Sequence, residues 1–206
     1  MRAVYAVVLA AGRGERFGGD KLLAPWRGHP LLWHALARVR SDVDRGGLTG
    51  GCVVVPEEAP DLEQLARDAG LVPVANRAAS SGIGSSIQAG FAWLTRSAGD
   101  GAAAAAIFLG DQPAVPPEVL DRLIRTWNGG EKPAVRPQYS EAHDQPGHPI
   151  VVDRSLWPLG LELMGDAGLG PLLAARGIPV FSVPVAGRNP DVDTPTDLTN
   201  LEGNSR

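Results

Sequence analysis

The stretch LAAGRGERFGGDK, Leu9 to Lys21, follows directly on the apolar run Val4–Leu9 near the start of the chain. The apolar run predicts a first β-strand, and the glycines and charged residues after it predict a loop at the strand's carboxyl end. Parallel sheets bind their ligands beyond the carboxyl ends of their strands. The loop is therefore the first place in this sequence to look for a binding site.

The residues of this loop leave three interpretations open. As a dinucleotide-binding turn its spacing fails, because Gly18 follows Gly12 and Gly14 one position too late for G-x-G-x-x-G. As a mobile surface loop, its cations would simply be solvated. As an anion site, the glycines would let backbone N–H groups approach a phosphate while Arg16 and Lys21 neutralise it. The mixture of glycines and cations at a strand end favours a triphosphate whose chemistry happens at phosphorus.

Composition narrows the class of protein. The chain has 206 residues, 44% hydrophobic and 20% charged, which fits one globular domain. Its formal net charge of −4 argues against nucleic acid or an anionic membrane as a partner. The only cysteine, Cys52, excludes a disulfide scaffold and fits a reducing compartment. The apolar run Ala3–Ala11 is far too short to span a bilayer, and we expect a cytoplasmic protein.

Short β-branched runs alternate with segments of helical periodicity along the chain. This alternation predicts right-handed crossovers and a mainly parallel sheet with helices on both faces, a three-layer αβα arrangement. Pro116 and Pro117 suit the first turn of one helix. The predicted strands are 4–9, 52–55, 71–75, 104–109, 134–136, 150–152 and 178–183, and helical periodicity runs through 31–39, 62–66, 87–94 and 120–127.

Several motifs resemble those of one enzyme family. The opening stretch is similar to L-A-[AG]-G-x-[SG]-x-R-[MF]-G-x-x-K of the nucleotidyltransferases with a glycosyltransferase-A-like fold. Within the MobA-like NTP transferases the chain looks most like the molybdenum cofactor cytidylyltransferases. The resemblance implies a Rossmann-like nucleotidyltransferase domain over 1–206, with 1–110 binding the nucleotide and 111–200 the metal and acceptor. The other similar motifs are Lys21–Pro25, Gly28–Leu32, Gly82–Gly90 (with Gly84 in place of a serine), Leu109–Pro113, Gly147–Ile150 and Asp191–Asp197.

The resemblance also implies roles for the nucleotide-binding residues. Arg16 would hold the β,γ-phosphates and Lys21 would steady the charge near the α-phosphate, so both are expected to be catalytic together with Asp111. Ala11, where the guanylyl branch carries glycine, favours CTP over GTP. Asn76 would face the base, while Ser85 could instead cap the following helix. The expected nucleotide-binding residues are Leu9, Ala10, Ala11, Gly12, Arg13, Gly14, Lys21, Asn76, Ser81, Gly82 and Ser85.

Two carboxylates, Asp111 and Asp193, follow predicted strands and could bridge one Mg²⁺ or Mn²⁺, since Mg²⁺ typically takes one or two carboxylates plus substrate phosphates. Two alternatives remain open: Asp111 as a turn former, and Asp193 as a helix cap with Asp191 as the better ligand. The resemblance implies that His148, Pro149 and Asp191 bind the acceptor.

The resemblance implies transfer of CMP from CTP to a phosphorylated molybdopterin, with release of pyrophosphate. A GTP-using enzyme, another acceptor such as a sugar phosphate or phospholactate, and a non-catalytic delivery protein for the molybdenum cofactor remain alternatives. The expected partners are small molecules, with a molybdenum hydroxylase or its maturation factor as a further candidate.

Overall fold

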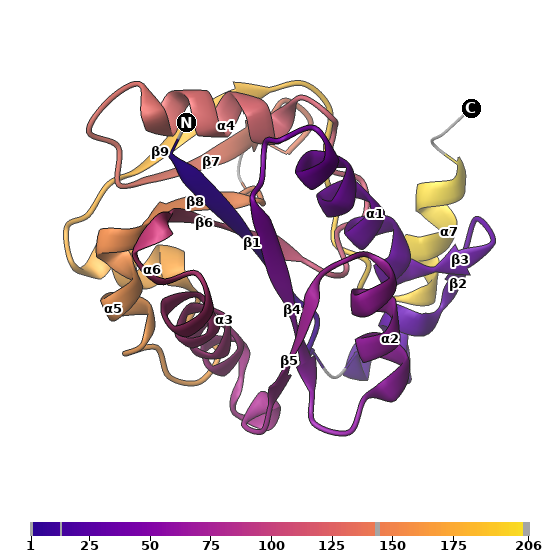
Figure 1. Ribbon diagram of the computed structural model, residues 1–206. Coiled ribbons are helices and arrows are strands. Elements are labelled where there is room, and N and C mark those ends of the chain that lie inside the picture. Colours follow the sequence, from indigo (N-terminus) through magenta and orange to yellow (C-terminus); the bar gives the residue numbers. More distant parts are fainter. Residues whose placement is uncertain (1, 13, 143–144, 204–206) are drawn as a thin grey trace.

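The structure is a computed structural model that describes residues 2–12, 14–142 and 145–203. Its main sheet has seven strands in the order β5-β4-β1-β6-β8-β7-β9, and helices cover both faces (Figure 1). The predicted three-layer α/β fold is confirmed. The strands are β1 (Ala3–Leu9), β4 (Gly50–Pro56), β5 (Val72–Asn76), β6 (Ala102–Leu109), β7 (Ala134–Tyr139), β8 (Ile150–Asp153) and β9 (Val180–Val185), and a hairpin of β2 (Pro25–Trp26) and β3 (His29–Pro30) lies outside the sheet.

One strand interrupts the parallel order. β8 pairs antiparallel with both β6 and β7, whereas β1, β4, β5 and β6 pair parallel with one another and β7 pairs parallel with β9. A loop without a crossover helix joins β7 to β8, and such a connection returns the chain in the opposite direction. The prediction of a mainly parallel sheet therefore holds.

The helices divide between the two faces because each presents one apolar stripe to the sheet. One core contains side chains from α1, α2 and α4, and the other contains side chains from α3, α5 and α6 (Figure 1). The prediction that Pro116 and Pro117 open a helix is wrong: α4 begins at Val119, and the Pro116 carbonyl accepts the Val119 N–H in a turn before it. The helices are α1 (Leu31–Asp44), α2 (Pro60–Asp68), α3 (Ile83–Ser97), α4 (Val119–Asn128), α5 (Trp157–Gly160), α6 (Leu169–Ala175) and α7 (Pro195–Gly203).

The neighbouring positions of β1 and β6 in the sheet bring the functional loops together. β1 and β6 end in register at Leu9 and Leu109, and the Gly110 N–H donates to the Leu9 carbonyl at 2.9 Å. Helix α3 packs closely against β1 at Gly90, where a Cβ would lie 2.4 Å from Cγ1 of Val7. The loops that leave β1 and β6 therefore begin side by side. Within the described residues, no helix combines the length and apolar content that crossing a bilayer requires.

Candidate active site

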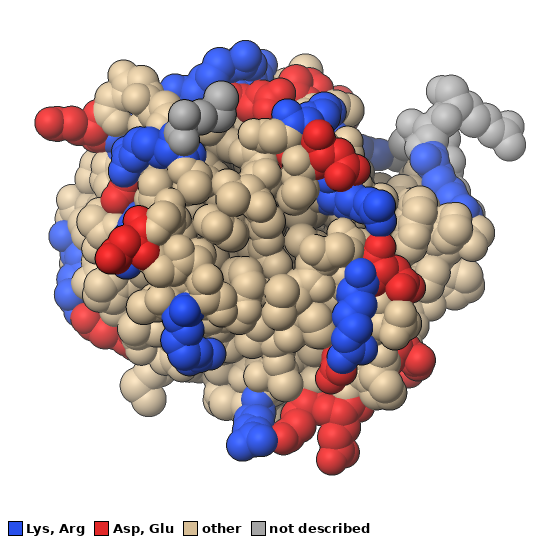
Figure 2. All heavy atoms as spheres, in the orientation of Figure 1, with Lys and Arg blue, Asp and Glu red and all other residues tan. Residues whose placement is uncertain are grey.

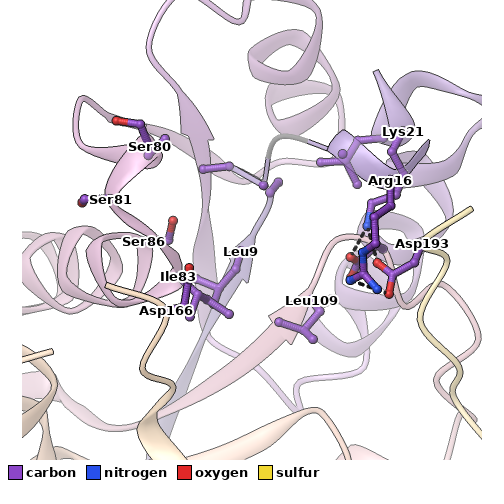
Figure 3. A pocket seen from close by; sticks show the side chains of 18 residues that line it. Leu9, Arg16, Lys21, Ser80, Ser81, Ile83, Ser86, Leu109, Asp166 and Asp193 are labelled. Atoms are coloured by element: carbon purple, nitrogen blue, oxygen red, sulfur yellow. Dashed lines mark hydrogen bonds and ion pairs between the residues drawn. The ribbon is translucent and has the colours of Figure 1, made fainter. Parts of the chain in front are cut away.

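A cavity of about 610 Å³ opens at the carboxyl ends of β1 and β6. Figure 3 shows its two sides: Arg16, Lys21 and Asp193 cluster on one, and the serine-rich loop before α3 lies on the other with Asp166. Leu9 and Leu109 lie between them. The lining includes Leu9, Ala10, Ala11, Gly12, Gly14, Arg16, Lys21, Ser81, Gly82, Ser86, Asp111, Asp166 and Asp193.

Lys21 joins the carboxylates that follow β6 and β9. Its Nζ donates to Oδ2 of Asp111 at 2.7 Å and to Oδ1 of Asp193 at 3.2 Å, and its side chain is buried. Burial acts to lower the pKa of Lys21, but Asp111 and Asp193 outweigh it and raise the pKa above its ordinary value. Lys21 therefore remains a charged ammonium at neutral pH, held in one place by two opposite charges.

The opening loop is shaped by glycine. Gly14 has a φ of +60°, and a Cβ there would lie 2.6 Å from the Gly19 carbonyl, so only glycine fits without displacing the loop. The short helical turn Glu15–Phe17 follows and presents Arg16, whose Nη2 lies 2.9 Å from Oδ2 of Asp193. Arg16 is exposed and lines the cavity, so its guanidinium lies at the solvent-facing edge of the site. Arg13 lies outside the described residues.

The alternative role of Asp193 as a helix cap is not the one observed. Thr194 and Asp197 cap α7 reciprocally: Oδ2 of Asp197 accepts from the Thr194 N–H at 2.7 Å, and Oγ1 of Thr194 accepts from the Asp197 N–H at 3.2 Å. Asp197 also accepts from the backbone N–H of Asp193. The Asp193 carboxylate is thus left to face Lys21 and Arg16.

Asp111 likewise does more than form a turn, because its carboxylate pairs with Lys21. Asp191 is oriented by a separate chain of hydrogen bonds: Nε2 of Gln112 donates to its Oδ1 at 2.7 Å, and Nδ2 of Asn189 donates to Oε1 of Gln112 at 3.0 Å. Partial desolvation and the charge of Asp111 raise the pKa of Asp191. Asp191 lines neither of the two large cavities, whereas Asp193 lines the first together with Asp111. Of the two, Asp193 is therefore better placed to bind a metal with Asp111.

Asn76 and Ser85 lie behind the cavity wall rather than on it. Nδ2 of Asn76 donates to the hydroxyls of Ser85 and Ser86 at 2.8 and 3.0 Å, and its Oδ1 accepts from the Ala78 N–H. The Asn76 amide is buried and fully engaged, so it is not free to read a base edge. Ser81 and Gly82 do line the cavity, and Ser86 joins them. Asn76 thus positions the loop that the resemblance assigns to the nucleotide.

Asp166 is a site residue that the sequence patterns missed, because it lies in an irregular segment between α5 and α6. Its exposed carboxylate lines the cavity beside Ile83 (Figure 3). The segment is tied to α3: Nε2 of Gln88 donates to the carbonyls of Leu161 and Leu163, and the Gly84 N–H donates to the Gly165 carbonyl. Gly84, the departure from the family's serine, lies where a Cβ would come within 3.1 Å of this segment.

A second cavity of about 780 Å³ adjoins the first and shares Leu9 and Ile83 with it. His148 lines it, but Pro149, which is buried, does not. Burial lowers the pKa of His148 to about 4, with Asp111 opposing the effect and Arg136 adding to it, so the imidazole is neutral at pH 7. Its Nδ1 is buried without a hydrogen-bond partner among the described residues.

The residues of the first cavity fit a divalent metal bound together with phosphates. Asp111 and Asp193 both reach the one ammonium of Lys21, so their carboxylates converge on a single point at the edge of the sheet. The described residues contain no group of three or more His, Cys, Asp or Glu side chains spaced to hold an ion by themselves. Two carboxylates completed by phosphate oxygens is the arrangement that Mg²⁺ prefers.

Fold and site together define a three-layer α/β domain in which a basic glycine-rich loop faces two carboxylates, one after β6 and one after β9. Residues 6–180 match the family model of the MobA-like NTP transferase domain, and the chain belongs to this family. The predicted membership of the MobA-like NTP transferases is thereby confirmed.

Curated relatives and solved structures agree with this assignment. A probable molybdenum cofactor guanylyltransferase of Thermococcus kodakarensis is 32% identical over 147 residues, covering 70% of this chain and 64% of that protein, so the chain spans less than two thirds of that relative. The crystal structure of Rv0371c from Mycobacterium tuberculosis H37Rv is 28% identical, with a TM-score of 0.77 and 97% of both chains covered. A manganese complex of Rv0371c is 26% identical, with a TM-score of 0.78 and coverage of 98% and 99%.

Proposed function

We propose that this protein is a nucleotidyltransferase that moves a nucleoside monophosphate from a triphosphate to a phosphorylated molybdopterin and releases pyrophosphate. The observation that carries the proposal is the cluster in which Lys21, at the end of the glycine-rich loop, pairs with Asp111 and Asp193. Family membership and the name of the Thermococcus relative support the reaction class and the molybdenum cofactor as its context.

Nucleotidyl transfer requires mainly that the two substrates are positioned and that the charge of their phosphates is neutralised. A phosphate oxygen of the acceptor attacks the α-phosphorus, a new P–O bond forms, and the bond to the leaving pyrophosphate breaks. Arg16, exposed at the cavity edge, binds the β,γ-phosphates, while Lys21 lies deeper and stabilises negative charge that develops near the α-phosphate. Asp111 and Asp193 would hold Mg²⁺ or Mn²⁺, which neutralises phosphate charge when bound. The manganese complex of Rv0371c supports such a metal.

For the donor we favour CTP. Ala10 and Ala11 follow directly after β1, both are buried, and both line the nucleotide cavity. The methyl group of Ala11 occupies space that a glycine would leave open, which favours the smaller pyrimidine. GTP is the second candidate, because the Thermococcus relative is named a guanylyltransferase.

The two cavities fit the expected division of the chain. The first is formed largely by residues before 112 and would take the nucleotide, while the second is formed largely by residues after 135 and would take the acceptor. Lys21, Asp111 and Asp193 would connect the two parts at the reaction centre. Asp191 would contribute by orienting the loop that carries Asp193.

The test is to incubate the protein with Mg²⁺, a phosphorylated molybdopterin and each of CTP, GTP, ATP and UTP, and to follow pyrophosphate release. We expect release with CTP to exceed release with the other triphosphates. Faster release with GTP would support the second candidate. Tight molybdopterin binding without release from any triphosphate would instead support a delivery protein.

A further inference from the structure

A charged side chain on the wall of the second cavity has no part in the proposed reaction centre. Among the described residues that line it, only Arg136 carries a charge at neutral pH. The remaining lining is apolar or neutral and includes Ile87, Ile107, Ile150 and Leu169. An arginine in these surroundings loses part of its hydration, and a partly buried charge is costly unless it is paired.

Arg136 has no such partner within the part of the chain that the structure describes. It lies in β7 opposite Ser182 of β9, is partly buried, and makes no hydrogen bond or ion pair there. Most other arginines of the chain pair with a carboxylate, as Arg38 does with Asp42 and Arg154 with Asp100. The guanidinium of Arg136 therefore remains available to an anion that enters the cavity.

Arg136 lies on the side of the second cavity that is near the reaction centre, because it and Asp111 both act electrostatically on His148. The imidazole lines the same cavity and lies within electrostatic range of both Asp111 and Arg136. Leu9 and Ile83 connect this cavity to the nucleotide cavity. An anion held by Arg136 would thus lie toward the α-phosphorus of a bound triphosphate, which is where an attacking phosphate has to be.

We propose that Arg136 binds the phosphate of the acceptor through its two non-attacking oxygens, so that the acceptor is a phosphate monoester whose other end packs against the apolar part of the lining. The inference rests on the proposed function and adds the residue that selects the acceptor. A planar guanidinium binds phosphate in a two-point arrangement that fixes direction as well as charge, and it leaves the third oxygen free to attack. The neutral imidazole of His148 beside it does not compete as a cation.

The test uses 4-methylumbelliferyl phosphate as a flat phosphate monoester and 7-methoxy-4-methylcoumarin as its uncharged counterpart. Binding of each to the full chain is measured by fluorescence with saturating α,β-methylene-CTP and Mg²⁺, so that the nucleotide's own phosphate positions are filled. Arg136→Gln is compared with the wild type, with Arg136→Lys as a second variant that keeps a charge. Arg125→Gln, on an exposed position of α4, is the matched control.

The wild type is expected to bind the phosphate ester more tightly than the methoxy compound. Arg136→Gln weakens binding of the ester by about tenfold or more, Arg136→Lys weakens it less, and both leave the methoxy compound and the CTP analogue unaffected. Arg125→Gln changes nothing. Equal binding of the ester by Arg136→Gln and the wild type, or no binding of it by the wild type, would overturn the inference.

The two proposals can fail separately. If Arg136→Gln loses the ester but no triphosphate releases pyrophosphate with any acceptor, the cavity inference stands and the transferase function fails. If transfer occurs and Arg136→Gln leaves the acceptor KM unchanged, the transferase stands and the inference is wrong.

Discussion

Nζ of Lys21 lies 2.7 Å from Oδ2 of Asp111, although 90 residues separate the two in the sequence. The first residue comes from the loop after β1 and the second from the loop after β6, and these neighbouring parallel strands end in register. The pair therefore exists because the sheet brings two strand ends together, and it joins the glycine-rich loop to the carboxylates.

Among the residues that the structure describes, Lys21 is the cation that pairs with both carboxylates, and replacing it removes that link. We expect Lys21→Ala to lower the rate of nucleotidyl transfer by about 10²–10³-fold, because a buried, fixed charge near the α-phosphate is lost. Lys21→Arg should restore little, since a guanidinium does not fit the space of a compact ammonium. Pyrophosphate release measures the rate, and circular dichroism verifies the fold. A fully active Lys21→Ala would remove Lys21 from the mechanism.

Asp193 and Asp197 form a matched pair that separates catalysis from helix capping. Asp193→Asn should abolish metal-dependent transfer and leave the melting temperature nearly unchanged, because its carboxylate faces Lys21 and Arg16. Asp197→Asn should lower the melting temperature and retain activity, because its carboxylate caps α7. Mn²⁺ binding, followed by electron paramagnetic resonance, should be lost only in Asp193→Asn. The reverse pattern would show that the assignment of the two aspartates is wrong.

His148 should make the folded state sensitive to acid. Its pKa is about 4 in the fold against 6.5 in a free chain, so the unfolded state binds more protons between these values. The contribution of the neutral His148 to the free energy of unfolding is therefore fully present above about pH 6.5. This contribution, on the order of 3 kcal/mol, is lost as the pH drops toward 4. Urea unfolding of the wild type and of His148→Gln at several pH values measures this. An equal loss of stability in both proteins over this range would contradict the prediction.

Gly82 holds the serine-rich loop against the segment that carries Asp166. Its φ is +100°, and a Cβ there would lie 2.3 Å from the backbone carbon of Gly165. Gly82→Ala is expected to cost about 1–3 kcal/mol of unfolding free energy and to weaken nucleotide binding. Gly101→Ala, where a Cβ would meet no atom within 4 Å, is the control. Unfolding curves and CTP titrations that do not distinguish the two variants would contradict this contact.

The strand–helix alternation was sufficient to predict the layered fold, whereas the expectation that Lys21, Asp111 and Asp193 share one site also needed the resemblance to the family's motifs. Their ion pairs were not predicted. Local periodicity could not predict that β8 runs antiparallel, because strand direction depends on the path of the connecting loop. It also could not show that Asn76 is engaged by Ser85 and Ser86, since these partners meet only after α3 packs beside β5. Asp166 carried no motif signal and is recognised only from the cavity it lines.

Ala11 is expected to determine the choice of nucleotide. Ala11→Gly should raise kcat/KM for GTP relative to CTP, because it removes a methyl group that lines the cavity. A change of about 1–3 kcal/mol in relative transition-state binding, or roughly 10–200-fold, is the scale of one methyl group in a closed pocket. Gly101→Ala again serves as the control. An unchanged ratio in Ala11→Gly would place the discrimination elsewhere.

Transfer of labelled phosphate is the decisive measurement for the proposed reaction. The protein is incubated with Mg²⁺, phosphorylated molybdopterin and CTP labelled at the α-phosphorus or, separately, at the γ-phosphorus. We expect the α-label in a molybdopterin dinucleotide and the γ-label in pyrophosphate, and we expect Lys21→Ala to form neither product at a comparable rate. If the α-label stays in CTP under all conditions, or appears only in free CMP, the protein does not carry out the proposed transfer.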